Sequence, residues 1–255
     1  MAPPIRQLVS SKFYTGRLRD GRVPPEGRLV LIDTSETRAR ATTRYTKRSA
    51  SMENIVHRAI TSEFIRAVSR AHPEKKILIL SPFAAQRRGY DREPNSKNVK
   101  TARFATVHAS QGSESEVVVL DFVFAPGRRK SAFLDSMVRP EFRNLVNVGL
   151  SRAREQLVLV AHTRAIRDHY VGTLLEELIE YFEEHAQVVS VPRSLEMVRL
   201  FKRLVGYASD GKQGNCHLAI CQSWAAWWCP MLSCGAHPLS RSRDADNERL
   251  QRGLP

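Results

Sequence analysis

Short runs of apolar residues, separated by polar segments, recur along most of the chain. Runs that are apolar at every position are typical of strands buried on both faces, as in a parallel sheet covered by helices. The predicted strands are RLVLID (28–33), KILIL (76–80), residues 99–107, VVVLDFVF (117–124), QLVLVAH (156–162) and QVVSV (187–191).

Between these runs the apolar residues follow the spacing of amphipathic helices. Ile55 to Val68 repeats at i, i+4, which predicts a helix that ends at His72-Pro73 and that Ser51 caps. Further helices are predicted over 141–154, 164–185 and 193–205, with a loop-rich lead-in over 1–27 and an exposed loop over 34–51. Strands alternating with helices predict an α/β doubly wound sheet.

The composition changes at Tyr207, after which all four cysteines and all three tryptophans occur. We therefore expect one domain over 1–206 and a poorly ordered tail over 207–255. The spacing C-x4-C-x7-C-x4-C lacks the C-x2-C pairs of common zinc sites, so no metal site is predicted. The tryptophans could form a helix face or stack on bases, but the abrupt change favours a stretch that is not selected coding sequence.

The chain carries 40 Lys and Arg against 26 Asp and Glu, a formal charge of +14. Such a balance favours binding to a polyanion, chiefly nucleic acid, over a role in solubility alone. The basic loop 38–48 could follow a nucleic-acid backbone or could be a solvated face. No apolar run is long enough to span a membrane and no secretory signal is visible, so we expect an intracellular protein of the nucleus or cytoplasm.

A phosphate-binding loop of the form G-x-x-x-x-G-K-[ST] does not occur in the sequence. The run Val117 to Asp121 has the pattern of a strand that ends in a Mg²⁺-binding carboxylate. Phe122 follows where a second acidic residue is expected, so we interpret Asp121 as an ordinary aspartate at a strand end.

Three polar segments at predicted strand ends carry the candidate chemistry. They are SPFAAQ (81–86), TVHASQGSE (106–114) and NVGLSRAR (147–154). Together and in this order they resemble motifs of the C-terminal motor domain of superfamily 1 RNA/DNA helicases, in the branch of the nonsense-mediated-decay and senataxin-type enzymes. The resemblance extends over about residues 1–165 and implies a RecA-like parallel sheet of the P-loop NTPase type, with helices on both faces.

The resemblance also implies roles for individual residues. Arg152 is similar to the arginine finger that contacts the γ-phosphate of ATP, and Arg154 to the arginine that positions it. The other matching residues fall into a nucleotide-binding group, Gln111, Gly112 and Glu114, and a group lining the single-strand channel, Ser81, Thr106 and His108.

Simpler alternatives remain for several of these residues. The arginines could cap a helix end, Glu114 could do the same, and His108 could be an ordinary loop histidine. Gln86 could contact nucleotide or hold its own turn.

The family's motor has two RecA-like halves, of which this sequence resembles the second. We therefore expect a half motor, whether a truncated product, a gene-model fragment or a decayed paralogue. It would use ATP and Mg²⁺ only with a complementary RecA-like domain, in cis or in trans, and would not hydrolyse ATP alone. Its expected partner is single-stranded RNA or DNA. The alternative is a non-catalytic module that binds nucleic acid or a partner and keeps only the fold.

Overall fold

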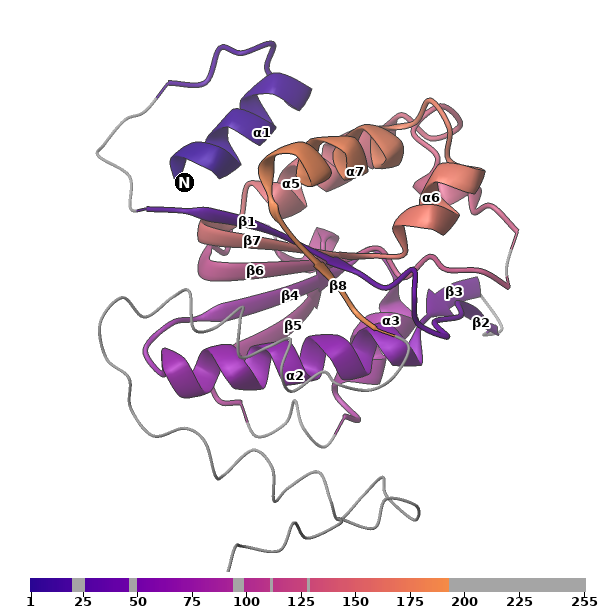
Figure 1. Ribbon diagram of the computed structural model, residues 1–255, viewed down its shortest axis with the longest axis horizontal. Coiled ribbons are helices and arrows are strands. Elements are labelled where there is room, and N and C mark those ends of the chain that lie inside the picture. Colours follow the sequence, from indigo (N-terminus) through magenta and orange to yellow (C-terminus); the bar gives the residue numbers. More distant parts are fainter. Residues whose placement is uncertain (20–25, 46–49, 94–98, 111, 128, 193–255) are drawn as a thin grey trace, which may run out of the picture. The chain divides into compact units, whose positions relative to one another are not determined.

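The described part of the chain is built around a six-stranded, wholly parallel sheet (Figure 1). The computed structural model describes residues 1–19, 26–45, 50–93, 99–110, 112–127 and 129–192. The strand order is β5-β4-β6-β7-β1-β8. The strands are β1 (Arg28–Asp33), β4 (Ile77–Ser81), β5 (Ala102–Thr106), β6 (Ser115–Asp121), β7 (Ala153–Ala161) and β8 (Gln187–Ser190). The predicted α/β fold is confirmed, and all six predicted strands are present.

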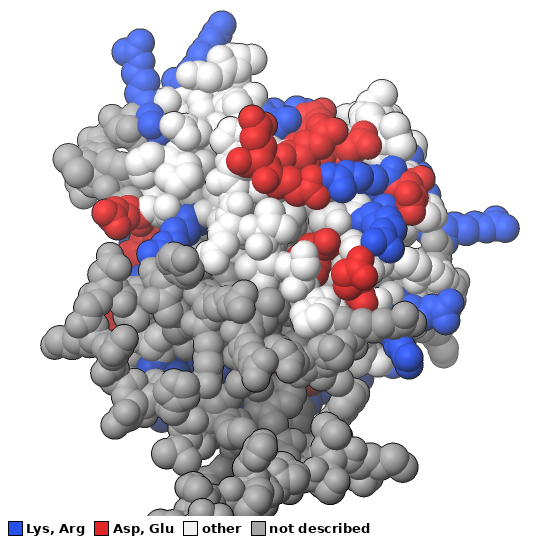
Figure 2. Space-filling view, viewed as in Figure 1, with Lys and Arg blue, Asp and Glu red and all other residues white. Residues whose placement is uncertain are grey.

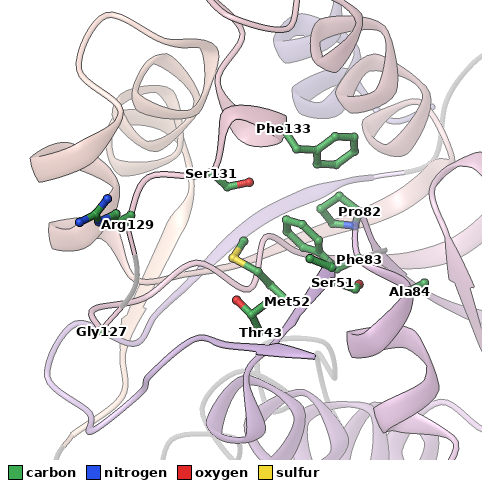
Figure 3. Close-up of a pocket in the computed structure, with 11 residues that line it drawn as sticks. Thr43, Ser51, Met52, Pro82, Phe83, Ala84, Gly127, Arg129, Ser131 and Phe133 are labelled. Atoms are coloured by element: carbon green, nitrogen blue, oxygen red, sulfur yellow. The ribbon is translucent and has the colours of Figure 1, made fainter. Parts of the chain in front are cut away.

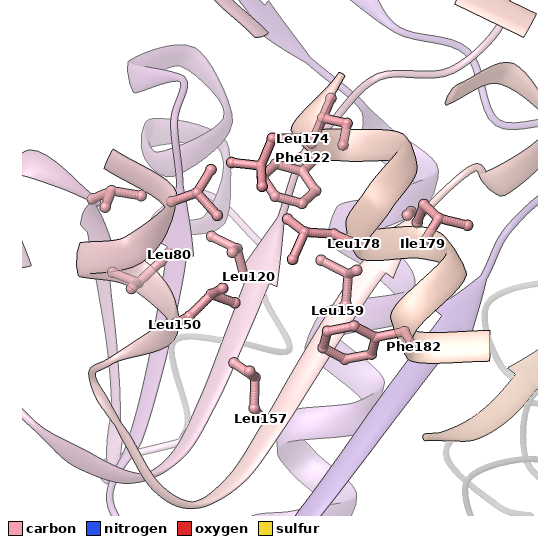
Figure 4. Close-up of a cluster of buried hydrophobic side chains, with 14 of the residues drawn as sticks. Leu80, Leu120, Phe122, Leu150, Leu157, Leu159, Leu174, Leu178, Ile179 and Phe182 are labelled. Atoms are coloured by element: carbon pink, nitrogen blue, oxygen red, sulfur yellow. The ribbon is translucent and has the colours of Figure 1, made fainter. Parts of the chain in front are cut away.

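The two faces of the sheet bury different kinds of apolar side chain. Because side chains alternate along a strand, each apolar run supplies both faces. One face carries mainly leucines, which join a core cluster with the overlying helices (Figure 4); they are Leu29, Leu31, Leu78, Leu80, Leu120, Leu157 and Leu159. The alternate positions are β-branched and equally buried: Val30, Ile32, Ile77, Ile79, Val117, Val119, Val158 and Val160. Burial on both faces explains why the runs contain no polar alternation.

Helices cover both faces, as Figure 1 shows. The leucine face is covered by α1 (Pro3–Phe13), α5 (Glu141–Leu150), α6 (Thr163–His169) and α7 (Leu174–His185). The opposite face is covered by α2 (Ile55–Ala71) and α3 (Ala84–Tyr90). Two short 3₁₀ turns, η1 (His108–Ser110) and η2 (Ala132–Leu134), lie in the connections after β5 and β6.

The expectation of a loop-rich lead-in over 1–27 was wrong, because α1 occupies Pro3–Phe13. Proline is tolerated in the first turn of a helix, where its missing N–H has no intrahelical partner. Ile5, Leu8 and Val9 form an i, i+3, i+4 stripe that is fully buried. The backbone N–H of Ala2 donates to the carbonyl of Arg154 at 2.7 Å, which ties the start of α1 to the start of β7.

The segment 34–51 is also more ordered than predicted. Its second half contributes to an antiparallel hairpin of β2 (Thr42–Tyr45) and β3 (Ala50–Glu53). Ser51 lies in β3 and does not cap α2. The cap is Asn54, whose side chain accepts from the N–H of His57 at 3.1 Å.

Two predicted helices have different bounds in the structure. The helix expected over 141–154 ends at Leu150, because β7 begins at Ala153 and includes Arg154. The helix expected over 164–185 is two helices, α6 and α7, separated by a turn in which Gly172 has φ +71°. The predicted helix over 193–205, the boundary near 206 and the tail lie outside the described residues.

Gly27 provides a test of how α1 is held. A Cβ at Gly27 would lie 2.0 Å from the Cβ of Ala2 and 3.0 Å from the carbonyl oxygen of Glu155. We expect Gly27→Ala to lower the free energy of unfolding by about 1–3 kcal/mol, because it overpacks this contact. Gly149→Ala is the matched control: its Cβ would meet atoms only at 3.5 Å and beyond, within α5. Alanine there should be neutral or stabilising by up to about 1 kcal/mol. Urea denaturation compares the two, and equal effects would contradict the role given to Gly27.

Candidate functional site

The predicted nucleotide-side residues lie at the amino ends of the two central strands. Glu114 comes just before β6, Arg152 just before β7, and Arg154 is the second residue of β7. Ser115 pairs with Ala153 in the ladder, and its N–H donates to the carbonyl of Arg152 at 3.1 Å. The structure therefore brings these three residues together. We call this group the amino-edge cluster.

Glu114 and Arg154 form an exposed ion pair. The Arg154 Nε donates to Glu114 Oε2 at 2.9 Å, and its Nη1 lies 3.8 Å from Glu116 Oε1. The hydrogen bond to Glu114, with that carboxylate's charge, raises the pKa of the Arg154 guanidinium further. Both side chains are about half exposed, so the pair adds little to stability. It does fix where both groups point.

Arg152 turns back onto its own helix. Its Nε donates to the carbonyl of Val148 at 3.1 Å, and its Nη2 donates to Ser151 Oγ at 3.3 Å. In these contacts Arg152 caps the end of α5, which is the simpler alternative to a role as an arginine finger. A guanidinium has five N–H donors, so capping does not use all of them.

The remaining residues of the nucleotide-side group lie in the loop before Glu114. Gly112 has φ +79°, which only glycine adopts readily, and a Cβ there would meet no other atom. Its backbone is exposed, which permits close approach of a ligand. Gln111 lies outside the described residues.

The predicted nucleic-acid group lies at the other end of the strands. Ser81 and Thr106 are the last residues of β4 and β5 and are paired in the ladder. Ser81 is buried, and its Oγ accepts from the N–H of Phe83 at 3.2 Å. Thr106 is half-buried, and its Oγ1 accepts from the N–H of Ala109 at 3.4 Å, while His108 is exposed. Thr106 and His108 can meet a ligand directly, whereas Ser81 is placed to hold the turn after β4.

The two groups are therefore separated by the length of the sheet. With about 3.3 Å per residue, the seven residues of β6 span about 20 Å. The carboxyl edge of the sheet carries Thr106 and His108, and the amino edge carries Glu114, Arg152 and Arg154. One ligand cannot contact both groups unless it extends along the domain.

A pocket of about 760 Å³ opens at the carboxyl edge, beyond the end of β4 (Figure 3). We call it the carboxyl-edge pocket. Its lining residues come from β2, β3, the turn after β4 and the segment after β6; they are Thr43, Ala50, Ser51, Met52, Pro82, Phe83, Ala84, Gly127, Arg129, Ser131 and Phe133. The rings of Phe83 and Phe133 meet edge to face, with centroids 5.6 Å apart. Pro82 and Phe83 belong to the first sequence motif, but the hairpin and Phe133 gave no sequence signal for this site.

A buried polar network, also missed from the sequence, lies beneath this edge. Asp121, the last residue of β6, is completely buried. Its Oδ1 accepts from His57 Nδ1 at 2.8 Å and from the N–H of Val123 at 2.9 Å. Its Oδ2 accepts from Gln86 Nε2 at 2.6 Å and from the Tyr90 hydroxyl at 2.8 Å. Asp121 is at a strand end, as predicted, but every carboxylate oxygen is used inside the protein, which does not favour a metal role.

The network shifts two pKa values in opposite directions. Burial alone would raise the pKa of Asp121, but the charge of His57 and the hydrogen bonds from His57, Gln86 and Tyr90 outweigh it and lower that pKa. Burial, with the charge of Asp121, raises the pKa of Tyr90. Gln86 also bridges to the backbone of Asn54, accepting from its N–H at 2.8 Å and donating to its carbonyl at 3.1 Å. Gln86 thus joins α3 to the start of α2, which favours a role in holding the fold over a contact with nucleotide.

Asp121→Asn tests this network. The amide nitrogen would face donors that now need an acceptor, so we expect a loss of about 3 kcal/mol or more in the free energy of unfolding at neutral pH. Because the pKa of Asp121 is lowered by folding, its stabilisation is complete above the ordinary aspartate pKa of about 4 and is lost as pH falls through the lower folded value.

Urea denaturation between pH 7 and pH 3 measures both effects. The difference in the free energy of unfolding between wild type and Asp121→Asn should become smaller at the acid end of the range. Asp168→Asn, at an exposed carboxyl on α6, should leave the curve unchanged. A constant gap at every pH would show that Asp121 does not titrate as described.

Charge on the leucine-face side is distributed unevenly. Acidic side chains gather over α7 (Figure 2), whose sequence LLEELIEYFEEH contains five glutamates. Part of this charge is offset, by Lys12 and Arg143 on Glu177 and by Arg167 on Glu183. A polyanion would be repelled from the surface of α7.

The described residues offer neither a membrane span nor a cluster of metal ligands. In that part of the chain, no helix has the length and apolar character needed to cross a membrane. Nor do three or more His, Cys, Asp or Glu side chains there converge as a metal would require.

The parallel sheet, the covering helices and the ordered motifs define the chain as a RecA-like domain of the kind found as the C-terminal motor domain of superfamily 1 helicases. The sequence pattern of the AAA domain family matches residues 1–164, and the chain belongs to this family.

The chain is similar to parts of two larger proteins and to one solved domain. The DNA-binding protein SMUBP-2 of Mesocricetus auratus is 29% identical over 112 residues, which is 44% of this chain and 10% of that protein. Helicase SEN1 of Saccharomyces cerevisiae is 27% identical over 202 residues, which is 71% of this chain and 8% of that protein. The chain thus spans about a tenth of the length of these relatives. A solved C-terminal domain of a possible DNA helicase from Lactobacillus plantarum is 13% identical with a TM-score of 0.35, and the match covers 62% of this chain and 83% of that one.

Proposed function

We propose that this domain is the second half of an ATP-dependent helicase motor. It binds single-stranded nucleic acid at the carboxyl edge of its sheet and presents Arg152 to a nucleotide at the amino edge. The observation that supports this most directly is the separation of the two predicted residue groups onto opposite edges of one sheet. Its similarity to Helicase SEN1 and to the DNA-binding protein SMUBP-2 supports the same proposal.

The carboxyl edge suits a single strand bound without sequence selection. Exposed His108 and the hydroxyl of Thr106 offer hydrogen bonds to phosphate oxygens, which position a strand but do not read its bases. The acidic surface of α7 lies in the helix layer and not at this edge, so it would not repel a nucleic acid bound here.

The amino edge suits the phosphates of ATP but not Mg²⁺. Two guanidinium groups, of Arg152 and Arg154, lie two residues apart at the start of β7, and the exposed Gly112 lies three residues before the start of the neighbouring β6. A planar guanidinium can stabilise charge that develops on a transferred phosphoryl group. The carboxylate of Glu114 is already paired with Arg154, so we assign the Mg²⁺ ligands and the phosphate loop to a second RecA-like domain.

Arg152 caps the end of α5 before any nucleotide binds. Its Nε donates to the carbonyl of Val148, so a γ-phosphate would be contacted by the N–H groups that capping leaves unused. Glu114 holds Arg154 in place through the ion pair, and a nucleotide that used this carboxylate would have to compete with Arg154 for it.

Binding to a single strand tests the first part of the proposal. Fluorescence anisotropy with a labelled oligonucleotide should show affinity that falls as salt rises, because phosphate contacts release counterions. We expect His108→Ala to weaken binding about threefold or more, as loss of a hydrogen bond predicts. His169→Ala, at an exposed histidine on α6, is the matched control and should have no effect. Equal effects of the two substitutions would remove His108 from the interface.

Complementation tests the second part. The domain is mixed with a separate RecA-like half that carries a G-x-x-x-x-G-K-[ST] loop, and ATP hydrolysis is measured. We expect hydrolysis to exceed that of either half alone, and Arg152→Ala to reduce the gain by about 10³-fold, as for other arginine fingers. Arg167→Ala, an exposed arginine on α6, should keep the gain. A domain that binds nucleic acid but never supports hydrolysis would instead be a non-catalytic binding module.

A further inference from the structure

The carboxyl-edge pocket has no role in the activities discussed so far. None of Ser81, Thr106 and His108 lines it. We propose that it receives one unstacked base of the bound single strand. This inference rests on the proposed function, since it names how the strand is held at that edge.

The walls of the pocket suit the face of a base. Phe83, Met52 and Pro82 lie side by side below Phe133 (Figure 3). Phe83 and Met52 are almost fully buried, at 8% and 6% exposure, so they form a fixed wall. The side chain of Phe133 is 37% exposed, which leaves part of its apolar ring in water. A base stacked on the ring would remove this surface from water.

Phe133 is held in position by rings on both sides. Its centroid lies 5.6 Å from that of Phe83 and 6.0 Å from that of Phe142, both edge to face. The ring is therefore oriented before any ligand arrives, which lowers the entropy lost on binding.

Polar groups at the rim suit the edges of a base. Thr43, Ser51 and Ser131 each bring a hydroxyl to the lining. Ser51 Oγ accepts from the N–H of Ala85 at 3.0 Å, so its own hydrogen is directed elsewhere and can be donated. The backbone N–H of Ser131 donates to the Tyr170 hydroxyl at 2.9 Å, which anchors the segment after β6 that carries this wall. Hydroxyls both donate and accept, so they tolerate different bases.

The charge of the lining favours an anionic ligand. Its eleven residues include Arg129 and no Asp or Glu. The nearby Glu53 is buried and is already paired with Arg58 and Arg44. A nucleotide in the pocket would thus meet no opposing carboxylate from the lining. An apolar peptide side chain would leave the three hydroxyls of the lining without a partner, whereas a base can use both the aromatic wall and these hydroxyls.

The size of the pocket is consistent with this ligand. Its volume of about 760 Å³ lies within the usual range of ligand-binding clefts, about 300–1,000 Å³. It can therefore hold a base with its sugar and phosphate.

Two 12-residue oligonucleotides with the same phosphates separate a base contact from a backbone contact. One is oligothymidine, and the other carries abasic sites throughout. By fluorescence anisotropy, we expect Phe133→Ala to weaken binding of oligothymidine by about 5- to 150-fold, the range for loss of one stacked base. Phe133→Ala and wild type should bind the abasic strand equally. Phe133→Trp should restore binding of oligothymidine, because it restores the ring.

A substitution outside the pocket serves as the control, and different outcomes would overturn the base-binding proposal and the proposed function. Met137→Ala changes an exposed side chain in the same segment that does not line the pocket, and it should leave both affinities unchanged. Thermal unfolding of each variant shows that the fold is kept. If Phe133→Ala weakens both oligonucleotides equally, or neither, the base-binding proposal is overturned while single-strand binding stands. If wild type binds neither oligonucleotide, the proposed function itself fails.

Discussion

A single direction shared by all six strands is the constraint on which the rest of this domain depends. Parallel strands need crossover connections, so helices cover both faces and every strand starts at one edge and ends at the other. Loops that follow strands therefore gather at the carboxyl edge, and loops that precede strands gather at the amino edge. The faces are occupied by the apolar core, which leaves the two edges to carry chemistry. The placement of Thr106 and Arg152 on opposite edges follows directly from where each motif stands relative to its strand.

The buried carboxylate of Asp121 holds together the segments beneath the carboxyl edge. A buried charge must be solvated by protein groups, and here those groups come from α2, α3 and the turn after β6. His57 extends the network to Thr34, whose Oγ1 lies 2.9 Å from its Nε2, just beyond β1. One carboxylate thereby joins several segments that surround the pocket. The same interactions that stabilise the fold also fix the floor of the edge where we place the nucleic acid.

The sequence predicted the sheet well because its signals are local. The runs from RLVLID to QVVSV are apolar at consecutive positions, and such runs indicate strands that are buried on both faces. The helix over Pro3–Phe13 was missed because two prolines masked its short apolar stripe, and the hairpin because its sequence is polar and basic. Motifs identified the amino-edge cluster. The pocket and the Asp121 network could not be predicted, because they join segments such as Ser51, Phe83 and Phe133 that are brought together only by the fold.

The segment between Thr106 and Ser115 crosses from one edge of the sheet to the other. Two of its serines bond to its backbone: Ser110 Oγ donates to the carbonyl of Val107 at 2.6 Å, and Ser113 Oγ donates to the carbonyl of Ser110 at 2.7 Å. Val107 is buried, and a Cβ on Gly149 of α5, the helix that leads into Arg152, would lie 3.6 Å from its side chain. This segment therefore links the two edges by a short stretch of chain, and its buried Val107 lies next to the helix that leads into Arg152. In the function proposed above, a nucleic acid and a nucleotide would bind at opposite ends of this one segment.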